Sequence, residues 1–397
     1  MANTLLTPTA VTRKALMILH QKLTFIGAIN RQYDDSFAKS GAKIGDSLKI
    51  RLPNEYVVRS GATLSAQDTA ETSTTLQVAT QKGVDLNFTS TDLTLSLDDF
   101  ASRILEPAMS VLAANIEADA LTMRKDVYNI IDNDAATLTF KNVMQARQAL
   151  NDNLAPPDNN RSIILSTGHE VTLVDALKGL FNDSANISKQ YREGMMGRTA
   201  GFDFMSSTQM TDHQTGTAAK TTGYLINGGS QTGSALTVDG GTTTFLVGDV
   251  ITLAGVYRVH PETKVSTGVL QQFVITANSG TSATSLAISP AIVASGARQN
   301  VSGSPADNAA IVKVGAGASE LLSGSLAFHK DAFTFATADL VMPTGVDFSA
   351  REVYDGISMR VVRQYDINND KFPTRLDVLY GFKTIRPQLA CRIHADG

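Results

Sequence analysis

Residues 97–131, LDDFASRILEPAMSVLAANIEADALTMRKDVYNII, are the stretch around which the fold is organised. Apolar or small side chains recur every three or four residues and so form one stripe along a predicted helix. The stripe consists of Leu97, Phe100, Ile104, Ala108, Leu112, Ile116, Ala120, Met123, Val127 and Ile131. Unbroken, this helix would be about 50 Å long, more than the diameter of a small domain. We therefore predict a strut with other elements packed along it.

Two positions qualify this prediction. Pro107 lacks a backbone donor, so the helix either kinks there or truly begins there after a short preceding turn. Glu117 lies off the stripe, so we expect Glu117→Lys to be mild. Ile116→Asp should prevent folding, because it would bury an unpaired charge.

Composition limits the class of protein. A chain of 397 residues, 43% of them hydrophobic, can bury two or three domain-sized cores. Its net charge of −4, with both signs interspersed, gives no polybasic footprint for nucleic acid or an anionic membrane. Cys391 is the single cysteine, so no internal disulfide forms. Because neither a membrane-spanning run nor a signal peptide is evident, we expect a soluble, cytoplasmically made protein.

Two segments before the strut have little apolar surface. A short amphipathic helix follows Thr7, with Leu16, Leu19, Leu23 and Ile26 on its apolar side. From residue 44 to 91 the period becomes two, which predicts a long hairpin whose return side carries Leu76, Val78, Val84, Leu86 and Phe88. Short helices and lone hairpins are marginal in water. We therefore expect both segments to be ordered mainly by neighbouring subunits.

The middle of the chain changes character twice. Helices are predicted over 140–154 and from Thr167 to Phe181, with a buried strand at 162–165 between them and a capping box at 167–170. From about 222 to 317 the chain is rich in Thr, Ser and Gly, and short β-type runs recur between turn signals. This pattern predicts a small β-barrel or sandwich inserted in a surface loop. Its loops, such as Gly296–Ala306, are candidates for touching a neighbour.

The last fifty residues are predicted to form an antiparallel sheet with a turn at DINNDKFP. In this turn, residues 366–370 and then Asp377 carry oxygens at positions that resemble a calcium loop. Lys371 stands where that loop requires glycine, and helices do not flank it. A polar hairpin turn is the better interpretation, and calcium stays open as the alternative.

The sequence shows no pattern of catalytic or metal-binding residues. His20, His169, His213, His260, His329 and His394 are scattered without metal spacing, and a solvated or capping role is the expectation for each. The run GTAAKTT from Gly216 matches a Walker A loop only loosely. We therefore predict no catalytic residues, no cofactor and no metal.

The order of parts resembles the major capsid proteins of tailed phages, which have the Hong Kong 97-type fold. Three runs sharpen the resemblance to podophage coat proteins with an insertion domain: GLFNDSANISKQYREGMMGRTAGFDFMSS, FLVGDVITLAGVYRVHPETKVSTGVLQQFVIT and RVVRQYDINNDKFPTRLDVLYGFKTIRP. The resemblance implies an α+β chain and the following parts: an N-terminal arm (1–31), an extended-loop hairpin (32–96), a spine helix (97–135), an axial and peripheral α/β region (136–221), an inserted β-barrel-like domain (222–318) and the remaining axial and peripheral domains (319–397).

The resemblance also implies a function. Such a subunit assembles with itself, in hexamers and pentamers, into an icosahedral virion shell around double-stranded DNA. A scaffolding protein and a portal are the expected partners, assembly takes place in the bacterial host cytoplasm, and a membrane is not involved. Two alternatives remain. A tail or surface-adhesion protein would explain the inserted β-domain but not the strut, and an enzyme would need acid–base residues in register.

Overall fold

The computed structural model of the chain describes residues 8–34, 47–59, 61–64, 66–67, 71–89, 101–177, 197–315, 317–369 and 371–396. The chain forms two compact units, each built from separate stretches of sequence. Unit 1 consists of Met1–Leu52, Ser73–Thr122 and Phe333–Ile385, and unit 2 of Pro53–Thr72, Met123–Ala332 and Arg386–Gly397.

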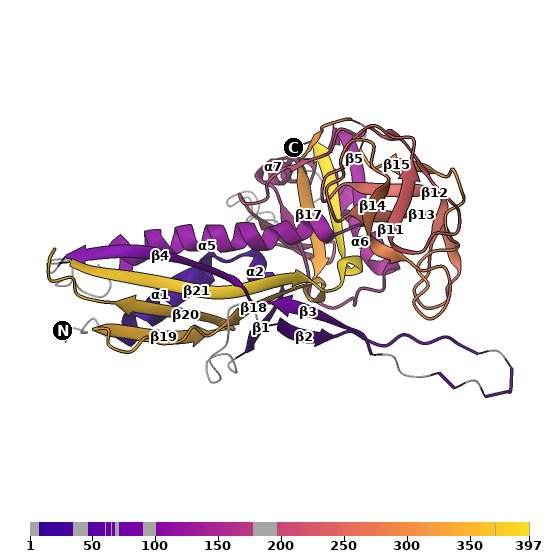
Figure 1. Cartoon of the computed structure of the whole chain (residues 1–397). Coiled ribbons are helices and arrows are strands. Elements are labelled where there is room, and N and C mark those ends of the chain that lie inside the picture. Colours follow the sequence, from indigo (N-terminus) through magenta and orange to yellow (C-terminus); the bar gives the residue numbers. More distant parts are fainter. Residues whose placement is uncertain are drawn as a thin grey trace. The chain divides into compact units, whose positions relative to one another are not determined.

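Unit 1 is organised around β21 (Lys371–Thr384), its longest strand. On one edge β21 pairs with β4 (Thr80–Thr89) along its first ten residues. On the other edge it pairs first with β20 (Ile357–Arg363) and then with β18 (Phe333–Ala338). The outer strands β19 (Phe348–Tyr354) and β1 (Asn30–Asp34) complete a six-stranded sheet, as Figure 1 shows.

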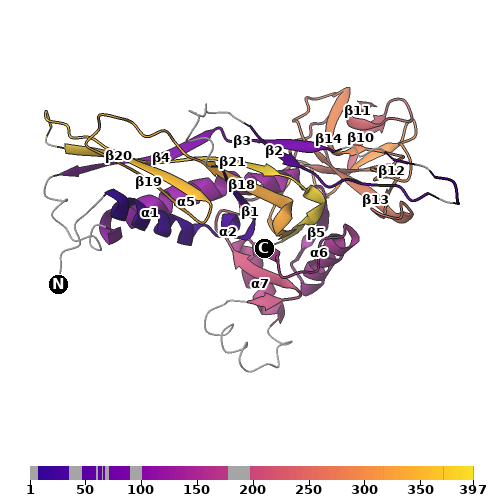
Figure 2. The ribbon, with the colours of Figure 1, turned by 90° about the horizontal axis from the view of Figure 1, so that it is seen from below.

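The predicted strut is the helix α5 (Glu106–Leu121), which lies along β4 and β21 (Figures 1 and 2). A π-helical turn at Ala101–Leu105 precedes α5, and Pro107 falls in its first turn. Of the two possibilities at Pro107, a kink or a helix start, the structure therefore shows the helix start. The stripe from Ala108 to Ala120 is buried, which confirms the predicted core face. Leu97 and Phe100 lie outside the described residues.

The spine helix is shorter than the predicted range of 97–135. It tightens into a 3₁₀ turn at Thr122–Asp126, and the chain continues as the strand β5 (Ile130–Thr137). The sequence pattern misled here because Val127 and Ile131 keep the helical spacing although Ile131 pairs with Ile393 in a parallel ladder. Backbone pairing with β22 (Ala390–Asp396) therefore overrides the local period.

The predicted long hairpin is also corrected. Its paired part is short, with β2 (Ser47–Arg51) against β3 (Ser73–Gln77) and Leu48 opposite Leu76. The residues assigned to its return side beyond Val78 belong to β4, which pairs with β21. Alternation identified the strand correctly, but it does not specify a partner as distant in sequence as Leu376, which lies 292 residues after Val84.

Unit 2 contains a mixed sheet of order β5-β22-β17-β6-β8-β7. Its central strands are β17 (Gly324–His329) and β6 (Arg161–Leu165), and β8 (Phe202–Ser206) and β7 (Arg198–Thr199) follow. The helix α6 (Phe140–Asp152) begins with a capping box formed by Thr139 and Asn142. The helix α7 is described as Thr167–Leu177, and the part predicted beyond it lies outside the described residues. Its cap is Ser166, whose Oγ accepts the His169 N–H, and not the predicted Thr167.

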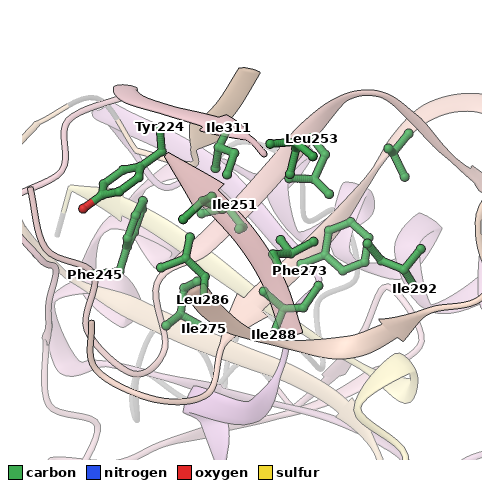
Figure 3. Close-up of a cluster of buried hydrophobic side chains, with 14 of the residues drawn as sticks. Tyr224, Phe245, Ile251, Leu253, Phe273, Ile275, Leu286, Ile288, Ile292 and Ile311 are labelled. Carbon is green, nitrogen blue, oxygen red and sulfur yellow. The ribbon is translucent and has the colours of Figure 1, made fainter. Parts of the chain in front are cut away.

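The inserted segment forms a closed barrel of order β10-β11-β14-β13-β12-β15. Its strands are β10 (Thr221–Ile226), β11 (Gly233–Asp239), β12 (Val250–Val259), β13 (Ser266–Ile275), β14 (Ser285–Ile292) and β15 (Ala310–Lys313). Figure 3 shows the aliphatic and aromatic side chains that fill it, among them Phe245, Ile251 and Phe273. Each such side chain stabilises the fold by about 1.5–3 kcal/mol on burial.

Closure of the barrel explains how it can be an insertion. The first and last strands pair with each other, with Thr221 opposite Val312, so the chain enters and leaves at one place. The Lys313 N–H donates to the Lys220 carbonyl at 3.1 Å beside this junction. Insertions whose ends are this close disturb a host fold little. Among the described residues, no helix is both long and apolar enough to cross a bilayer.

Candidate assembly surfaces

The amphipathic arm is anchored inside unit 1. The helices α1 (Pro8–Lys22) and α2 (Phe25–Ala28) bury Leu16, Leu19 and Ile26 completely, against α5 and the β19–β20 pair. The expectation that neighbouring subunits mainly order this arm is therefore wrong for the described residues. An amphipathic period predicts that a face is buried, but it does not show which surface covers it.

Glu117 of α5 holds the arm in place. Its carboxylate accepts hydrogen bonds from the Thr24 N–H at 2.8 Å, the Thr24 hydroxyl at 2.6 Å and the Phe25 N–H at 3.1 Å. Glu117 thus satisfies donors at the start of α2 while its own side chain is only 3% exposed. The expectation that Glu117→Lys is mild is wrong, because the position is a buried acceptor of three hydrogen bonds.

An ionic contact holds His20 and Arg31, which lie on either side of Thr24. Asp355, at the turn between β19 and β20, lies 2.7 Å from His20 Nε2 and 2.6 Å from an Arg31 guanidinium nitrogen. Partial burial raises the pKa of Asp355, but the hydrogen bonds from His20 and Arg31 outweigh it and hold that pKa below its usual value. The contact is half exposed, so it orients the arm more than it stabilises it.

The root of the β2–β3 hairpin packs closely on the sheet of unit 1. A Cβ atom on Gly381 of β21 would overlap the Gln77 carbonyl oxygen of β3, so only glycine permits this approach. Leu76 and Val78 are buried beside Ala336 and Leu379. The hairpin is thus anchored at its base by its own subunit.

The segment beyond that base, Pro53–Leu64, has a different environment. Its backbone from Leu52 to Arg59 belongs to no strand. The side chains of Tyr56, Val58 and Leu64 are 58%, 89% and 82% exposed, although tyrosine and valine favour half-buried strands. The segment makes a few polar contacts: Val57 and Gln67 exchange two hydrogen bonds, and Glu55 lies 3.8 Å from Lys264. Beyond the segment, Thr72 accepts from Arg298 at 2.8 Å.

A second apolar surface lies on the barrel. Tyr257 of β12 and Leu270 of β13 are opposite each other in the ladder, and both are partly exposed. Val265 and Val269 extend this patch along the same hairpin, with about two thirds and just over half of their surfaces open. In a single subunit these four side chains remain in water, which is the property of an interaction surface.

The prediction of solvated or capping roles holds for His260 but is wrong for His169, His213 and His394. His169, His213, His329 and His394 are buried in unit 2. His213 donates to Asp249 at 3.0 Å, and His169 lies between Ser325 at 2.7 Å and the Ala395 carbonyl at 2.9 Å. His260 accepts backbone N–H groups at the β12–β13 turn, which is a capping role. Sequence spacing missed the buried group because its members come from a helix and strands that are far apart in the chain.

Asp370, one of the residues of the calcium-like turn between β20 and β21, lies outside the described residues, so the structure does not test the calcium alternative. The Asp366 carboxylate accepts from the Asn369 amide at 2.7 Å and the Asn368 N–H at 3.0 Å, and these bonds lower its pKa. Asp377 is fully buried between the guanidinium groups of Arg360 at 2.7 Å and Arg375 at 2.8 Å. In the described part of the chain, no three His, Cys, Asp or Glu side chains converge as a metal site. The Walker-like run likewise holds no cradle, because the Gly216 N–H donates to Asp249.

Residues 21–392 match the family described as P22 coat protein, gene protein 5. The chain belongs to the P22 coat protein family. Its fold is accordingly the α+β Hong Kong 97-type capsid fold with an inserted all-β domain, and it is a structural major capsid protein of the tailed-phage type. As a member of this family it assembles with itself into the shell of a virion.

Solved capsid structures are similar to the chain over most of its length. A structure from Mycobacterium phage Che8 has 12% identity and a TM-score of 0.47, and it covers 94% of this chain and 90% of that chain. The mature capsid of bacteriophage PhiM1 has 13% identity and a TM-score of 0.44, covering 94% and 87%. The CUS-3 coat protein I-domain is 32% identical, with a TM-score of 0.19, and covers 23% of this chain and 96% of that domain. A search of curated protein sequences gives no match.

Proposed function

We propose that this coat protein forms a closed icosahedral shell of hexamers and pentamers around double-stranded DNA. The observation that supports this most directly is the segment Pro53–Leu64, whose described residues belong to no strand and expose the side chains of Tyr56, Val58 and Leu64. A subunit that exposes such a segment gains stability when a neighbour covers it. Its function is thus completed by assembly.

The proposal assigns a role to each part of the chain. The arm (1–31) and the spine that ends at Asp126 support the subunit. The extended loop (32–96) reaches an adjacent subunit through Tyr56, Val58 and Leu64. The inserted domain (222–318) braces the subunit and meets a neighbouring capsomer with its β12–β13 patch and with Gly296–Ala306. The α/β region (136–221) and the closing segment (319–397) form the axial and peripheral domains.

The partners follow from the same proposal. A scaffolding protein and a portal take part in assembly, which proceeds in the bacterial host cytoplasm. The shell encloses DNA without reading its sequence, and the net charge of −4 suits a container that does not grip its DNA tightly. The role is structural and not catalytic.

Electron microscopy of the purified, assembled protein tests the function itself. Closed shells are expected. Tubes or fibres would favour a tail or adhesion protein, and small discrete oligomers would argue against a shell protein.

Limited trypsin digestion with mass spectrometry tests the role of the extended segment. Arg59 lies in this exposed segment, so the free subunit should be cut there quickly. In assembled shells the same bond should be shielded by the adjacent subunit. Cleavage of Arg59 at the same rate in shells and in free subunits would contradict the assignment.

A further inference from the structure

A large cleft in unit 2 lies between the barrel and the extended segment Pro53–Leu64. Its volume is about 590 Å³, and all the residues that line it belong to unit 2. One side of the cleft carries Glu55, Tyr56 and Val58 of the segment. The other side consists mainly of two barrel loops, the β12–β13 turn and the loop that follows β14. A space of this size is typical of a binding site, and it shows that the segment does not fill the barrel surface beside it.

Hydrogen bonds within the barrel hold this wall of the cleft in place. Lys264 Nζ donates to the Gln299 carbonyl at 3.3 Å, which joins the two loops, and the Lys264 side chain is only 17% exposed. The Val259 N–H donates to the Asn300 carbonyl, and the Asn300 amide oxygen accepts the Val293 N–H at 2.9 Å. Because these bonds do not involve the segment, the wall keeps its shape when the segment moves away.

The segment itself is weakly bound to the wall. Glu55 is about half exposed and lies 3.8 Å from Lys264 Nζ, and an exposed ion pair of this length contributes little to stability. Val57 exchanges two hydrogen bonds with Gln67, so its backbone groups are used within the loop and not by the barrel. Asn54 Oδ1 is buried and has no hydrogen-bond partner in the described part of the chain, which is unfavourable. The free subunit thus has a preformed wall and a segment that makes few contacts with it.

The wall and the segment nevertheless match in chemistry. Two cations of the barrel loops already face the extended loop, with Lys264 near Glu55 and Arg298 donating to the Thr72 hydroxyl at 2.8 Å. The wall also has apolar surface at Leu154, which follows α6 and is 42% exposed. The segment brings a carboxylate and largely exposed apolar side chains, which are the groups that such a wall binds.

We propose that this cleft receives the extended segment of a neighbouring copy of the same chain, in exchange for its own. The inference rests on the proposed function and names the surface that covers the segment in the shell. The occupant is a second copy because the family assembles with itself, and because a copy brings the same groups that the wall already contacts.

The exchange needs no new kind of contact. The contacts that break within one subunit form again between two, and each subunit gives one segment and receives one, which closes a ring of subunits. A neighbour's segment enters the cleft more deeply, because the β2–β3 root that restrains it belongs to another chain. Burial of Tyr56 and Val58 in the cleft is the gain in free energy that favours the exchange.

Carbodiimide cross-linking tests the exchange with the native side chains, because the reagent joins the Glu55 carboxylate to the Lys264 amine as an amide with loss of water. Trypsin then releases Glu55 in residues 52–59, which hold one acidic side chain, and Lys264 in residues 259–298, which hold one lysine. A linked pair of these peptides therefore reports this contact alone. Equal parts of ¹⁵N-labelled and unlabelled subunits are mixed before assembly, and the linked pairs are weighed by mass spectrometry.

In free subunits, both peptides of a pair should carry the same label, because the contact lies within one chain. In shells, pairs of mixed label should be as abundant as the two unmixed kinds together, because neighbours are drawn at random. Closed shells that give only unmixed pairs, or no pair at all, would overturn the exchange and leave the shell function intact. Absence of closed shells in electron microscopy would instead overturn the proposed function, and the exchange with it.

Two matched variants place the incoming segment in the cleft. Ala297→Trp puts a bulky side chain on the wall at a half-buried position, and we expect it to lower the yield of mixed pairs at least about fivefold, because overpacking excludes the segment. Ala277→Trp, at an exposed position after β13 and outside the cleft, should keep the wild-type yield. An undiminished yield of mixed pairs in Ala297→Trp would also contradict the proposal.

Discussion

The arm and the extended segment Pro53–Leu64 differ although their sequences suggest the same behaviour. Both are short, both carry apolar side chains and neither has a core of its own. The arm buries Leu16 and Leu19 and is fixed by the Glu117 carboxylate, whereas Val58 and Leu64 remain in water. The difference shows that an apolar face becomes part of the subunit where other elements cover it, as α5 and the β19–β20 pair cover the arm.

The largest expected effect on stability comes from removing the Glu117 contact that holds the arm. Glu117→Lys replaces a buried acceptor with a buried cation and leaves the Thr24 and Phe25 donors unpaired, so we expect a loss of about 3 kcal/mol or more in the free energy of unfolding. Urea unfolding of the free subunit measures it.

The matched control is Val111→Lys on the same helix, where the side chain is largely exposed. It should change stability by less than about 0.5 kcal/mol. Similar unfolding midpoints for the two variants would show that Glu117 does not secure the arm.

The next effect concerns the root of the hairpin. Gly381→Ala places a Cβ atom on the Gln77 carbonyl, so β3 must move away from β21 at a cost of about 1–3 kcal/mol. Gly27→Ala is the control, because a Cβ there meets nothing within 4 Å. If Gly381→Ala were as stable as wild type in thermal unfolding, the root would not be held by its own sheet.

The histidine-containing core of unit 2 should lose stability at a higher pH than the arm. Burial lowers the pKa of His213 and of His394, so below about pH 6.5 the unfolded chain binds protons that the folded chain does not. Stability is therefore fully present above the unfolded pKa and falls with decreasing pH, by at most about 1.4 kcal/mol per pH unit for each histidine. The groups that face these two rings are Asp249, Lys125, Arg124, Arg392 and His169.

The arm should respond at lower pH. The pKa of Asp355 lies below its ordinary value of 3.8, so its contacts to His20 and Arg31 persist until the pH falls through that lowered pKa. Amide hydrogen exchange at pH 7.5 and 5.5 should thus show β9 (His213–Gln214) and β22 losing protection while α1 keeps it. Simultaneous loss in α1 at pH 5.5 would contradict this order.

The sequence predicted those features of the fold that depend on the local pattern of apolar residues. The period of three to four residues located the stripe from Ala108 to Ala120, and short β-type runs between turn signals predicted the inserted β-domain. It could not predict pairings between distant segments, such as β4 with β21, because hydrophobic period does not encode a partner. Glu117 and the buried histidines were missed for the same reason. Their chemistry depends on groups such as Thr24 and Asp249 that only the fold brings to them.

The smallest effect on stability, and the sharpest test of the comparison, is expected at the exposed segment. Val58→Ser and Leu64→Ser remove apolar surface that the free subunit leaves in water, so the free energy of unfolding should change by less than about 0.5 kcal/mol. Assembly should be weakened, because each contact in the shell would lose about 1 kcal/mol or more of stabilisation per substituted residue. Leu76→Ser at the buried root is the counterpart and should destabilise the subunit itself. Urea unfolding and sedimentation of assembly reactions separate the two classes. Normal shell yield from Val58→Ser and Leu64→Ser together would mean that the segment's exposed side chains do not join subunits, and that it resembles the arm after all.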